Sequence, residues 1–367
     1  MSECCPPQGA SCCGLATEEY EYGQQPFECG EVVTLMGPVP VVSTELTRAD
    51  RLGALRVRAN IGRSRHRVRP GLYAIGEPDD AAPVLVTGNY KLTLDVVRSA
   101  MAGRDAWLLV IDSRGINVWC AAGKGVFGTA EVVRRVRTVN LPQVVSHTKL
   151  VLPQLAATGV AAHEVRVQTG FSVVWGPVRA VDLPAFLDAG MKATEAMRRV
   201  EFRLADRAQV MGVELSVLWR PQVLAPAAAL LIAAWALSVV WWPLAFPLAA
   251  AGVLFATVAV IAGAVLTPLL LPWLPGRAFA LKGATAGAVT ALVLALALTL
   301  AGGPAWLWGM AVVSAALASF VGMNFTGSST YTSPSGVEWE MRRAIPVQVV
   351  GVVVGIAVLV AGAVMGG

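Results

Sequence analysis

The stretch Ala106-Trp-Leu-Leu-Val-Ile-Asp112 decides the fold of the first half of the chain. Six consecutive apolar residues that end at an aspartate predict a buried strand, and Pro83–Thr87 has the same character. Leu92–Ala102 and Thr129–Val136 have helical periodicity and follow turn-forming residues. This alternation predicts an open α/β sheet of the Rossmann-like type, with ligands bound at the ends of the strands.

Three further segments continue the alternation after residue 148. These segments are Lys149–Ala157, Val165–Gln168 and Ser172–Trp175. The following stretch, Pro184–Leu204, is predicted to be one long helix. We therefore expect an α/β domain over residues 46–213.

The second half of the chain has a different composition. The 367 residues are 55% hydrophobic and only 14% charged, which is too apolar for one water-soluble fold. Nearly all charged residues precede Arg220, so residues 214–367 are predicted to be an all-α transmembrane domain. Five stretches approach the roughly 20 residues that a bilayer requires. They are Val223–Trp242, Pro247–Leu269, Leu281–Leu300, Trp306–Val321 and Ile345–Met365.

The basic residues around these stretches indicate an orientation. With five spans, all five flanking cations fall on the side of the N-terminal domain, namely Arg220, Arg277, Lys282, Arg342 and Arg343. The positive-inside rule then predicts a multi-pass protein of the cytoplasmic membrane, with its α/β domain in the cytoplasm. A Thr/Ser-rich segment, 324–343, becomes a cytoplasmic loop. No acidic residue falls in the five stretches, which favours an anchor over an ion-coupled transporter.

The formal net charge of +5 does not indicate a nucleic-acid partner. The basic residues are scattered and have no aromatic residues clustered among them. The chain begins Met-Ser-Glu-Cys-Cys-Pro-Pro without a signal-peptide pattern, so we expect a domain that is not exported and cysteines that stay reduced.

Residues 1–45 contain five of the six cysteines among Pro, Gly and Gln, and are predicted to be a flexible tail. The vicinal pairs Cys4-Cys5 and Cys12-Cys13 do not have the spacing of an iron–sulfur or zinc site. Adjacent thiols could capture a soft metal ion such as Hg(II), and an unstructured tail with incidental cysteines is the equal alternative.

The sixth cysteine, Cys120, lies between a predicted strand and a glycine-rich turn into a helix. Backbone N–H groups at such a place would lower the thiol pKa, although a cysteine between Trp119 and two alanines is more often a buried, inert thiol. The following Gly123-Lys-Gly-Val-Phe-Gly128 matches a dinucleotide fingerprint, but no acidic residue stands about twenty positions further on, so a nucleotide site is not predicted.

The eight residues Asn117-Val-Trp-Cys-Ala-Ala-Gly-Lys124 closely resemble the signature of the mercury-methylating corrinoid proteins, the HgcA family. The resemblance extends to Val86–Thr93, His147–Leu155, Gly159–Val165, Gly176–Ala180 and the Thr/Ser-rich segment, so it covers nearly everything after the tail. The α/β domain is also similar to the corrinoid-binding part of the corrinoid iron–sulfur protein of acetyl-CoA synthesis, which lacks the cysteine motif and the spans.

The resemblance implies a corrinoid cofactor and a set of residues that hold it. Residues 117–124 would form a short cap helix under the corrinoid, with Cys120 as the lower axial ligand of cobalt. Asn117 and Trp119 would fix the cap, and Thr87 and Thr93 would contact the nucleotide tail of the cofactor. The remaining members of this helix are implied cofactor neighbours too, the small ones permitting close approach: Val118, Ala121, Ala122, Gly123 and Lys124.

The same resemblance implies methyl transfer from cobalt to Hg(II). Hg(II) is an electrophile, and a soft thiolate donates more electron density to the metal than the neutral imidazole of other corrinoid proteins. The implied partners are a methyltetrahydrofolate-linked methyl donor and HgcB, a ferredoxin-like protein with two [4Fe–4S] clusters. Two alternatives stay open: a membrane-anchored corrinoid methyl carrier of one-carbon metabolism that meets mercury incidentally, and a corrinoid sensor or transport component.

Overall fold

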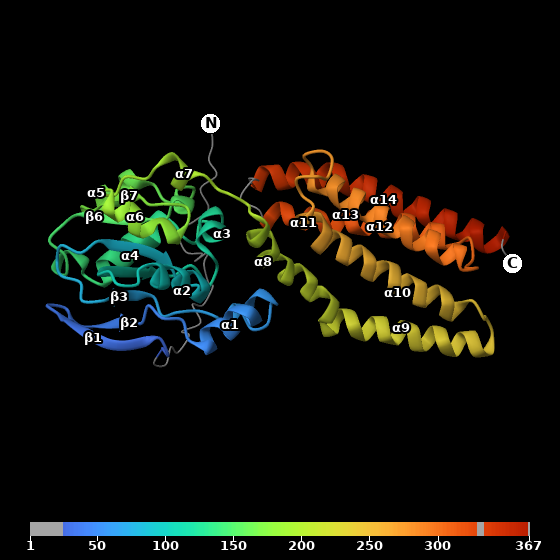
Figure 1. Ribbon diagram of the computed structural model, residues 1–367, viewed down its shortest axis with the longest axis horizontal. Coiled ribbons are helices and arrows are strands. Elements are labelled where there is room, and N and C mark those ends of the chain that lie inside the picture. The colour runs from blue at the N-terminus through green and yellow to red at the C-terminus, as the bar shows by residue number, and fades with distance from the viewer. Residues whose placement is uncertain (1–24, 329–333, 366–367) are drawn as a thin grey trace, which may run out of the picture.

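The computed structural model describes residues 25–328 and 334–365. It consists of an α/β domain and a helical bundle that lie end to end (Figure 1). The bundle contains five helices that are long and apolar enough to cross a membrane. The expected class, an α/β domain followed by an all-α region, is confirmed: the sheet is mixed, and the helical region has five long apolar helices.

The α/β domain is built on one sheet of seven strands, in the order β1-β2-β3-β5-β4-β6-β7. The strands are β1 (Glu28–Thr34), β2 (Gly37–Val42), β3 (Gly71–Ile75), β4 (Val84–Gly88), β5 (Ala106–Ile111), β6 (Lys149–Leu152) and β7 (Ser172–Trp175). The four strands β5, β4, β6 and β7 are parallel, whereas β3 runs antiparallel to β5. The chain crosses from one side of β4 to the other between β5 and β6, so the strand order reverses between β4 and β6.

Eight helices belong to this domain and to its connection with the bundle. They are α1 (Arg48–Arg58), α2 (Lys91–Ala100), α3 (Val118–Gly123), α4 (Thr129–Thr138), α5 (Ala162–Thr169), α6 (Leu183–Asp188), α7 (Glu195–Arg198) and α8 (Leu204–Leu215). One face of the sheet packs against α3, α4 and α5, and the other against α2 and α6. All six residues of β5 are buried because both faces of that strand are covered.

Two sequence-based expectations in this domain are wrong in detail. Residues 25–45, expected to belong to a flexible tail, contain the hairpin β1-β2, which extends the sheet through β2 and β3. The hairpin is ordered because it buries apolar side chains, with Phe27 3% and Val42 2% exposed. The expected helix Pro184–Leu204 is broken, because Gly190 and Met191 both have positive φ and separate α6 from α7.

The bundle helices begin and end within a few residues of the expected spans, apart from the end of the fourth and the start of the last. They are α9 (Pro221–Val240), α10 (Ala245–Ile261), α11 (Thr267–Leu269), α12 (Phe279–Leu300), α13 (Leu307–Ser328) and α14 (Pro334–Met365). A π-helical turn, Ala262–Leu266, joins α10 to α11, so these two form one span. Close approach between helices relies on small residues: a Cβ on Gly283 would lie 2.6 Å from the carbonyl oxygen of Ala318.

The Thr/Ser-rich segment 324–343 is mostly helical rather than a loop, because α13 continues to Ser328 and α14 begins at Pro334. Residues 329–333 of this segment lie outside the described residues. The early start of α14 brings the buried Glu340 into the bundle, where its Oε1 accepts a hydrogen bond from the Ala280 N–H at 2.6 Å. This carboxylate therefore caps the N-terminus of α12, so the last span does carry an acidic group at its end.

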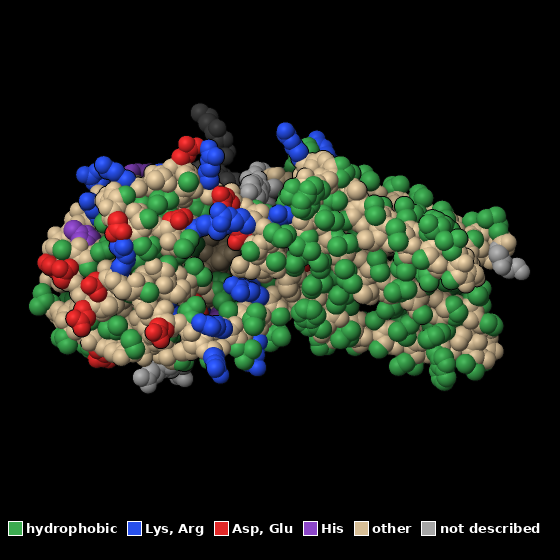
Figure 2. Space-filling model, in the orientation of Figure 1, with side chains coloured by type: hydrophobic (Ala, Val, Ile, Leu, Met, Phe, Trp, Pro, Cys, Tyr) green, Lys and Arg blue, Asp and Glu red, His purple; other side chains and the backbone are tan. Residues whose placement is uncertain are grey.

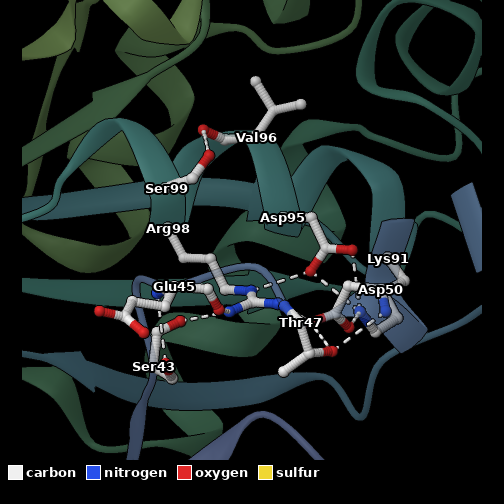
Figure 3. Close-up of polar contacts among 9 residues, drawn as sticks. All are labelled: Ser43, Glu45, Thr47, Asp50, Lys91, Asp95, Val96, Arg98 and Ser99. Atoms are coloured by element: carbon white, nitrogen blue, oxygen red, sulfur yellow. Dashed lines mark hydrogen bonds and ion pairs between the residues drawn. The ribbon is translucent and has the colours of Figure 1, made fainter. Parts of the chain in front are cut away.

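A buried network of charges fastens α1 and the chain before it to α2 (Figure 3). Lys91 Nζ donates to Asp50 at 2.5 Å and to Asp95 at 2.8 Å. Arg98, fully buried, donates to Asp50 at 2.9 Å and to Asp95 at 2.8 Å. The same guanidinium also donates to two backbone carbonyl oxygens before α1, those of Ser43 and Glu45. The network thereby positions α2, and several residues of this helix line the cavity described below.

Removing one carboxylate of this network should destabilise the domain strongly. We expect Asp50→Ala to cost about 3–5 kcal/mol of unfolding free energy, because it leaves Arg98 and Lys91 with uncompensated buried charge. Thermal unfolding of the purified full chain should register this as a lower melting temperature of the α/β domain. Asp188→Ala is the matched control: its pair with Arg104 is exposed, so its removal should change the melting temperature little.

The same aspartate should make the stability pH-dependent. Burial alone would raise the pKa of Asp50, but hydrogen bonds from Lys91 and Thr47 and the charge of Lys91 outweigh burial and hold this pKa well below its usual range. A carboxyl group with a depressed folded-state pKa stabilises the fold above its unfolded pKa of about 3.9 and loses this contribution as the pH falls below it. The stability difference between the wild type and Asp50→Asn should therefore be constant above about pH 5 and shrink in acid. A difference that grew in acid would contradict this assignment.

Candidate functional site

A cavity of about 420 Å³ lies at the carboxyl ends of the parallel strands. It is bordered by Leu85–Thr87 of β4, Val151–Pro153 at the end of β6, Gly176–Val178 after β7 and Asn117–Trp119 at the start of α3. This is the reversal point between β4 and β6, where ligands bind in open α/β sheets. Figure 2 shows a hollow at the junction of the α/β domain and the bundle, bordered by Lys and Arg side chains.

A buried hydroxyl in the cavity wall has no partner among the described residues. Thr87, the fourth residue of β4, is only 1% exposed, and its Oγ1 makes no hydrogen bond with residues 25–328 or 334–365. A buried hydroxyl without a partner costs free energy, so its presence at a cavity indicates a ligand that accepts or donates there. Thr93, which the sequence also indicated, lines the same cavity from α2.

The turn from β5 into α3 is organised by Asn89, a residue that the sequence reasoning did not single out. Asn89 is fully buried, and its Oδ1 accepts hydrogen bonds from the N–H groups of Ser113 (3.0 Å) and Gly115 (2.9 Å). Its Nδ2 donates to Asp112 Oδ1 at 3.0 Å. One side chain at the end of β4 thus shapes the neighbouring turn. A polar residue directly after a buried strand was the available signal.

Cys120 lies in the first turn of α3 and is half-buried. Asn117 caps this helix, since its Oδ1 accepts a hydrogen bond from the Cys120 N–H at 2.9 Å. Burial raises the pKa of the Cys120 thiol, and the charges of Lys124 and Arg63 and a hydrogen bond with Asn117 oppose this only in part. The expected lowering of the thiol pKa by the helix N-terminus is therefore wrong. The helix α3 has only six residues, and the Cys120 N–H already donates to the Asn117 side chain.

The structure brings most of the predicted site residues together but gives them different surroundings. Thr87, Thr93, Asn117, Val118 and Trp119 line the cavity. Cys120 is the next residue along α3 and is not part of the cavity wall itself. Two members of the motif lie in the core, Ala121 and Ala122, and two are exposed at the end of the helix, Gly123 and Lys124. The tail cysteines Cys4, Cys5, Cys12 and Cys13 lie outside the described residues.

The position of α3 is set by a close backbone contact. A Cβ on Gly159 would lie 2.4 Å from the Phe127 carbonyl oxygen and 2.9 Å from Ala122 Cα. Only glycine permits this approach, so the loop before α5 holds the end of α3 against the core. By contrast, a Cβ on Gly123 would meet nothing within 4 Å.

The far wall of the cavity comes from α8, which sequence reasoning divided between the two domains. Gln209 and Val213 of this helix face the cavity. Arg207, 8% exposed, donates to the carbonyl oxygens of Pro268 (3.0 Å) and Leu269 (2.9 Å) at the end of α11. One helix thus borders the cavity and is hydrogen-bonded to the helical bundle. No residue of α8 was predicted to belong to the site.

Two arginines near the start of the chain also line the cavity, Arg58 at the end of α1 and Arg63. The Arg63 guanidinium carbon lies 5.9 Å from the centre of the Tyr90 ring, another lining residue. The charge of Arg63 also acts on Cys120, so the cavity and the thiol share one electrostatic environment. Sequence reasoning took both arginines to be part of the scattered basic residues.

Known proteins resemble this part of the chain. The family of CO dehydrogenase/acetyl-CoA synthase delta subunits matches residues 44–187, which contain every residue that lines the cavity except Gln209 and Val213 of α8. The α/β domain is similar to these subunits. The match ends before the bundle.

Individual relatives agree with this match. The acetyl-CoA decarbonylase/synthase complex subunit gamma of Methanopyrus kandleri is 39% identical over 137 residues, 36% of this chain and 28% of that protein. The subunits of the same name from Archaeoglobus fulgidus and Methanothermobacter thermautotrophicus are 33% and 31% identical, each over 33% of this chain and 26% of the relative. The chain thus spans about a quarter of the length of these curated relatives.

The contact at Gly159 yields a test of how α3 is held. Gly159→Ala should displace or loosen α3, because its Cβ would collide with backbone atoms that cannot rotate away, and should cost about 1–3 kcal/mol. Amide hydrogen exchange over residues 117–124 should accelerate in this variant. Gly123→Ala adds the same methyl group to open space on α3, so equal acceleration in both variants would refute the assignment.

Proposed function

We propose that this protein is a membrane-anchored corrinoid-dependent methyl-transfer protein whose cofactor lies at the cavity beside α3. The observation that carries this proposal is the unpartnered Thr87 hydroxyl, buried in the wall of a cavity at the strand-order reversal. The similarity of residues 44–187 to subunits of acetyl-CoA-forming complexes supports it. So does the resemblance of residues 117–124 to the HgcA signature.

The residues around the cavity fit such a group. Cys120 offers a soft sulfur donor at the edge of the cavity, and soft thiolates suit transition metals. The raised pKa of Cys120 does not prevent this, because a coordinating metal ion itself drives deprotonation of a thiol. When bound, the corrinoid would supply a cobalt-carried methyl group.

The chain's own residues would divide the remaining tasks. Asn117, by capping α3, holds the backbone of Cys120 in place and so fixes where the sulfur can reach. Trp119 covers one side of the cavity with an apolar surface, while Thr87 and Thr93 offer hydroxyl groups to a polar part of the cofactor. Arg58 and Arg63 make part of the cavity lining positive and would favour an anionic group such as a phosphate.

We further propose Hg(II) as the methyl acceptor, on the strength of the resemblance to HgcA. A methyl group that bonds to Hg(II) must bring its bonding electrons, because Hg(II) is an electrophile. An anionic sulfur ligand at Cys120 would favour this better than a neutral imidazole, because it donates more electron density to the metal. The proposed partners are a ferredoxin-like protein of the HgcB type as reductant and a methyltetrahydrofolate-linked donor.

A second candidate function has its own support. The relatives that match the α/β domain are subunits of acetyl-CoA decarbonylase/synthase complexes, which favours a methyl carrier of one-carbon metabolism for which mercury is an incidental acceptor. The two functions share the cavity and the cofactor and differ in the acceptor. A competition assay of methyl transfer to Hg(II) against transfer to a thiol or a nickel acceptor separates them.

We also propose that the α/β domain faces the cytoplasm. Lys282 Nζ donates to the carbonyl oxygens of Leu271 (2.6 Å) and Leu274 (2.8 Å), on the side of the bundle that adjoins this domain. Arg220 and Arg277 lie next to span ends on that same side, and Arg342 and Arg343 lie near the start of the last span, Glu338–Met365, as the positive-inside rule requires for cytoplasmic ends.

Substitution of Cys120 tests the proposed function directly. Cys120→Ala should lower methylmercury formation more than about 100-fold, because the metal loses its sulfur ligand. The absorption spectrum of the full chain with added corrinoid should change at the same time. Cys120→His should bind corrinoid and methylate poorly. Cys29→Ala, which removes an exposed thiol on β1, is the matched control and should leave the spectrum and the rate unchanged.

Undiminished methylmercury formation in Cys120→Ala would sink the proposed role of the thiol. Cobalamin binding without turnover under reducing conditions would instead favour a sensor or transport component. Thr87→Val keeps the shape of the side chain and removes the hydroxyl, so it should weaken corrinoid binding without altering the sulfur-dependent features of the spectrum.

A further inference from the structure

The outer face of α1 and the turn after it expose an unusual amount of apolar surface. Leu52 is 52% exposed, Leu55 is 61% exposed, and Ile61, in the turn, is 56% exposed. Each leucine of α1 is four residues from an arginine on the same side of the helix, Leu55 from Arg51 and Leu52 from Arg56, and both arginines are exposed. The inner face is occupied by Asp50 and Val57 and cannot rotate outward without breaking the charged network. An apolar surface with a basic rim is thus held toward the outside.

The charge of this segment is of one sign. Between positions 51 and 69 the chain has no acidic residue and seven arginines, Arg51, Arg56, Arg58, Arg63, Arg65, Arg67 and Arg69. Such a density of cations complements an anionic surface. Large apolar side chains between basic residues are typical of segments that lie at the boundary between lipid headgroups and acyl chains.

Two contacts place this segment beside the membrane-spanning bundle. Asn60 Nδ2 donates to Ser216 Oγ at 3.1 Å, and a Cβ on Gly212 would lie 2.5 Å from the Arg58 carbonyl oxygen. Ser216–Trp219 is a 3-10 turn that leads into α9 at Pro221. At about 2 Å rise per residue, Ser216 lies within about 10 Å of the first turn of that span. Ile61, next to Asn60, therefore lies close to the end of the bundle that adjoins the α/β domain.

We propose that the exposed face of α1 and the turn 59–62 form a second membrane contact, in which Ile61 and Leu55 enter the lipid boundary and Arg51 and Arg56 meet anionic phospholipid headgroups. The occupant is the lipid leaflet on the side of the α/β domain, because the face is continuous with the bundle through α8 and its charge matches anionic lipid. The proposal does not depend on the proposed function or on which side of the membrane is cytoplasmic.

This contact would act on the cavity. Arg58 and Arg63 line the cavity and flank the proposed lipid-contacting turn, so the lipid would fix the rim of the site as well as the orientation of the domain. The spans hold the domain through α8 from one side, and α1 would hold it from another.

Site-specific photo-crosslinking of the full chain tests the proposal. The photoreactive residue p-benzoylphenylalanine replaces Ile61, and the protein is reconstituted in vesicles of phosphatidylcholine with or without phosphatidylglycerol. We expect a lipid adduct at position 61 that is at least about tenfold more abundant in phosphatidylglycerol vesicles than the adduct at position 35. Leu35 is the matched control, because it is 87% exposed but lies in the turn of the β1-β2 hairpin, away from the bundle (Figure 1).

Charge reversal separates the electrostatic part of the contact. The pair Arg51→Glu and Arg56→Glu should reduce the adduct at position 61 severalfold in phosphatidylglycerol vesicles, whereas Lys149→Glu with Arg166→Glu, on β6 and α5, should not. Amide hydrogen exchange over residues 51–61 of the unlabelled chain should also be slower in phosphatidylglycerol nanodiscs than in phosphatidylcholine. Equal adducts at positions 35 and 61, a protein adduct in place of a lipid adduct, or exchange that is insensitive to lipid would each overturn the proposal.

Discussion

The side-chain amide of Asn89 is the contact on which the geometry of the candidate site depends. It bonds the end of β4 to the turn that follows β5, and that turn delivers the cap of α3 and, three residues later, Cys120. Because Asn89 is fully buried, water cannot satisfy the hydrogen-bonding groups of its amide. The turn must therefore adopt the conformation that supplies these partners. The position of the first turn of α3, which carries Cys120, follows from a hydrogen-bonding requirement in the core.

The cavity walls come from the α/β domain and from the helix that joins this domain to the bundle. The strand ends, α2 and α3 belong to the α/β domain. The buried ion pairs among Asp50, Lys91, Asp95 and Arg98 hold α2 against α1. The remaining wall, α8, is bonded to the bundle through Arg207. An α/β domain that is similar to acetyl-CoA decarbonylase/synthase gamma subunits thus shares one helix with a bundle of five long apolar helices.

Sequence patterns predicted the broad organisation because they report burial over long segments. The run at 106–112 indicated a covered strand, and five apolar stretches indicated five spans; both are present. The tail was predicted to extend too far, because β1 and β2 are short and gain their stability from pairing with each other and with β3. The break between α6 and α7 was missed because positive φ at Met191 has no signal in composition.

The sequence by itself determined that the chain is an α/β domain joined to five apolar spans, and it marked Thr87, Thr93 and residues 117–124 for attention. Only the tertiary structure decided that five of these line one cavity, that Ala121 and Ala122 are core residues, and that burial raises the pKa of the Cys120 thiol. It also added Asn89, Arg58, Arg63, Gln209 and Val213 to the surroundings of the site. Periodicity reflects one element's contact with water or lipid, whereas a site depends on distances between elements far apart in the chain.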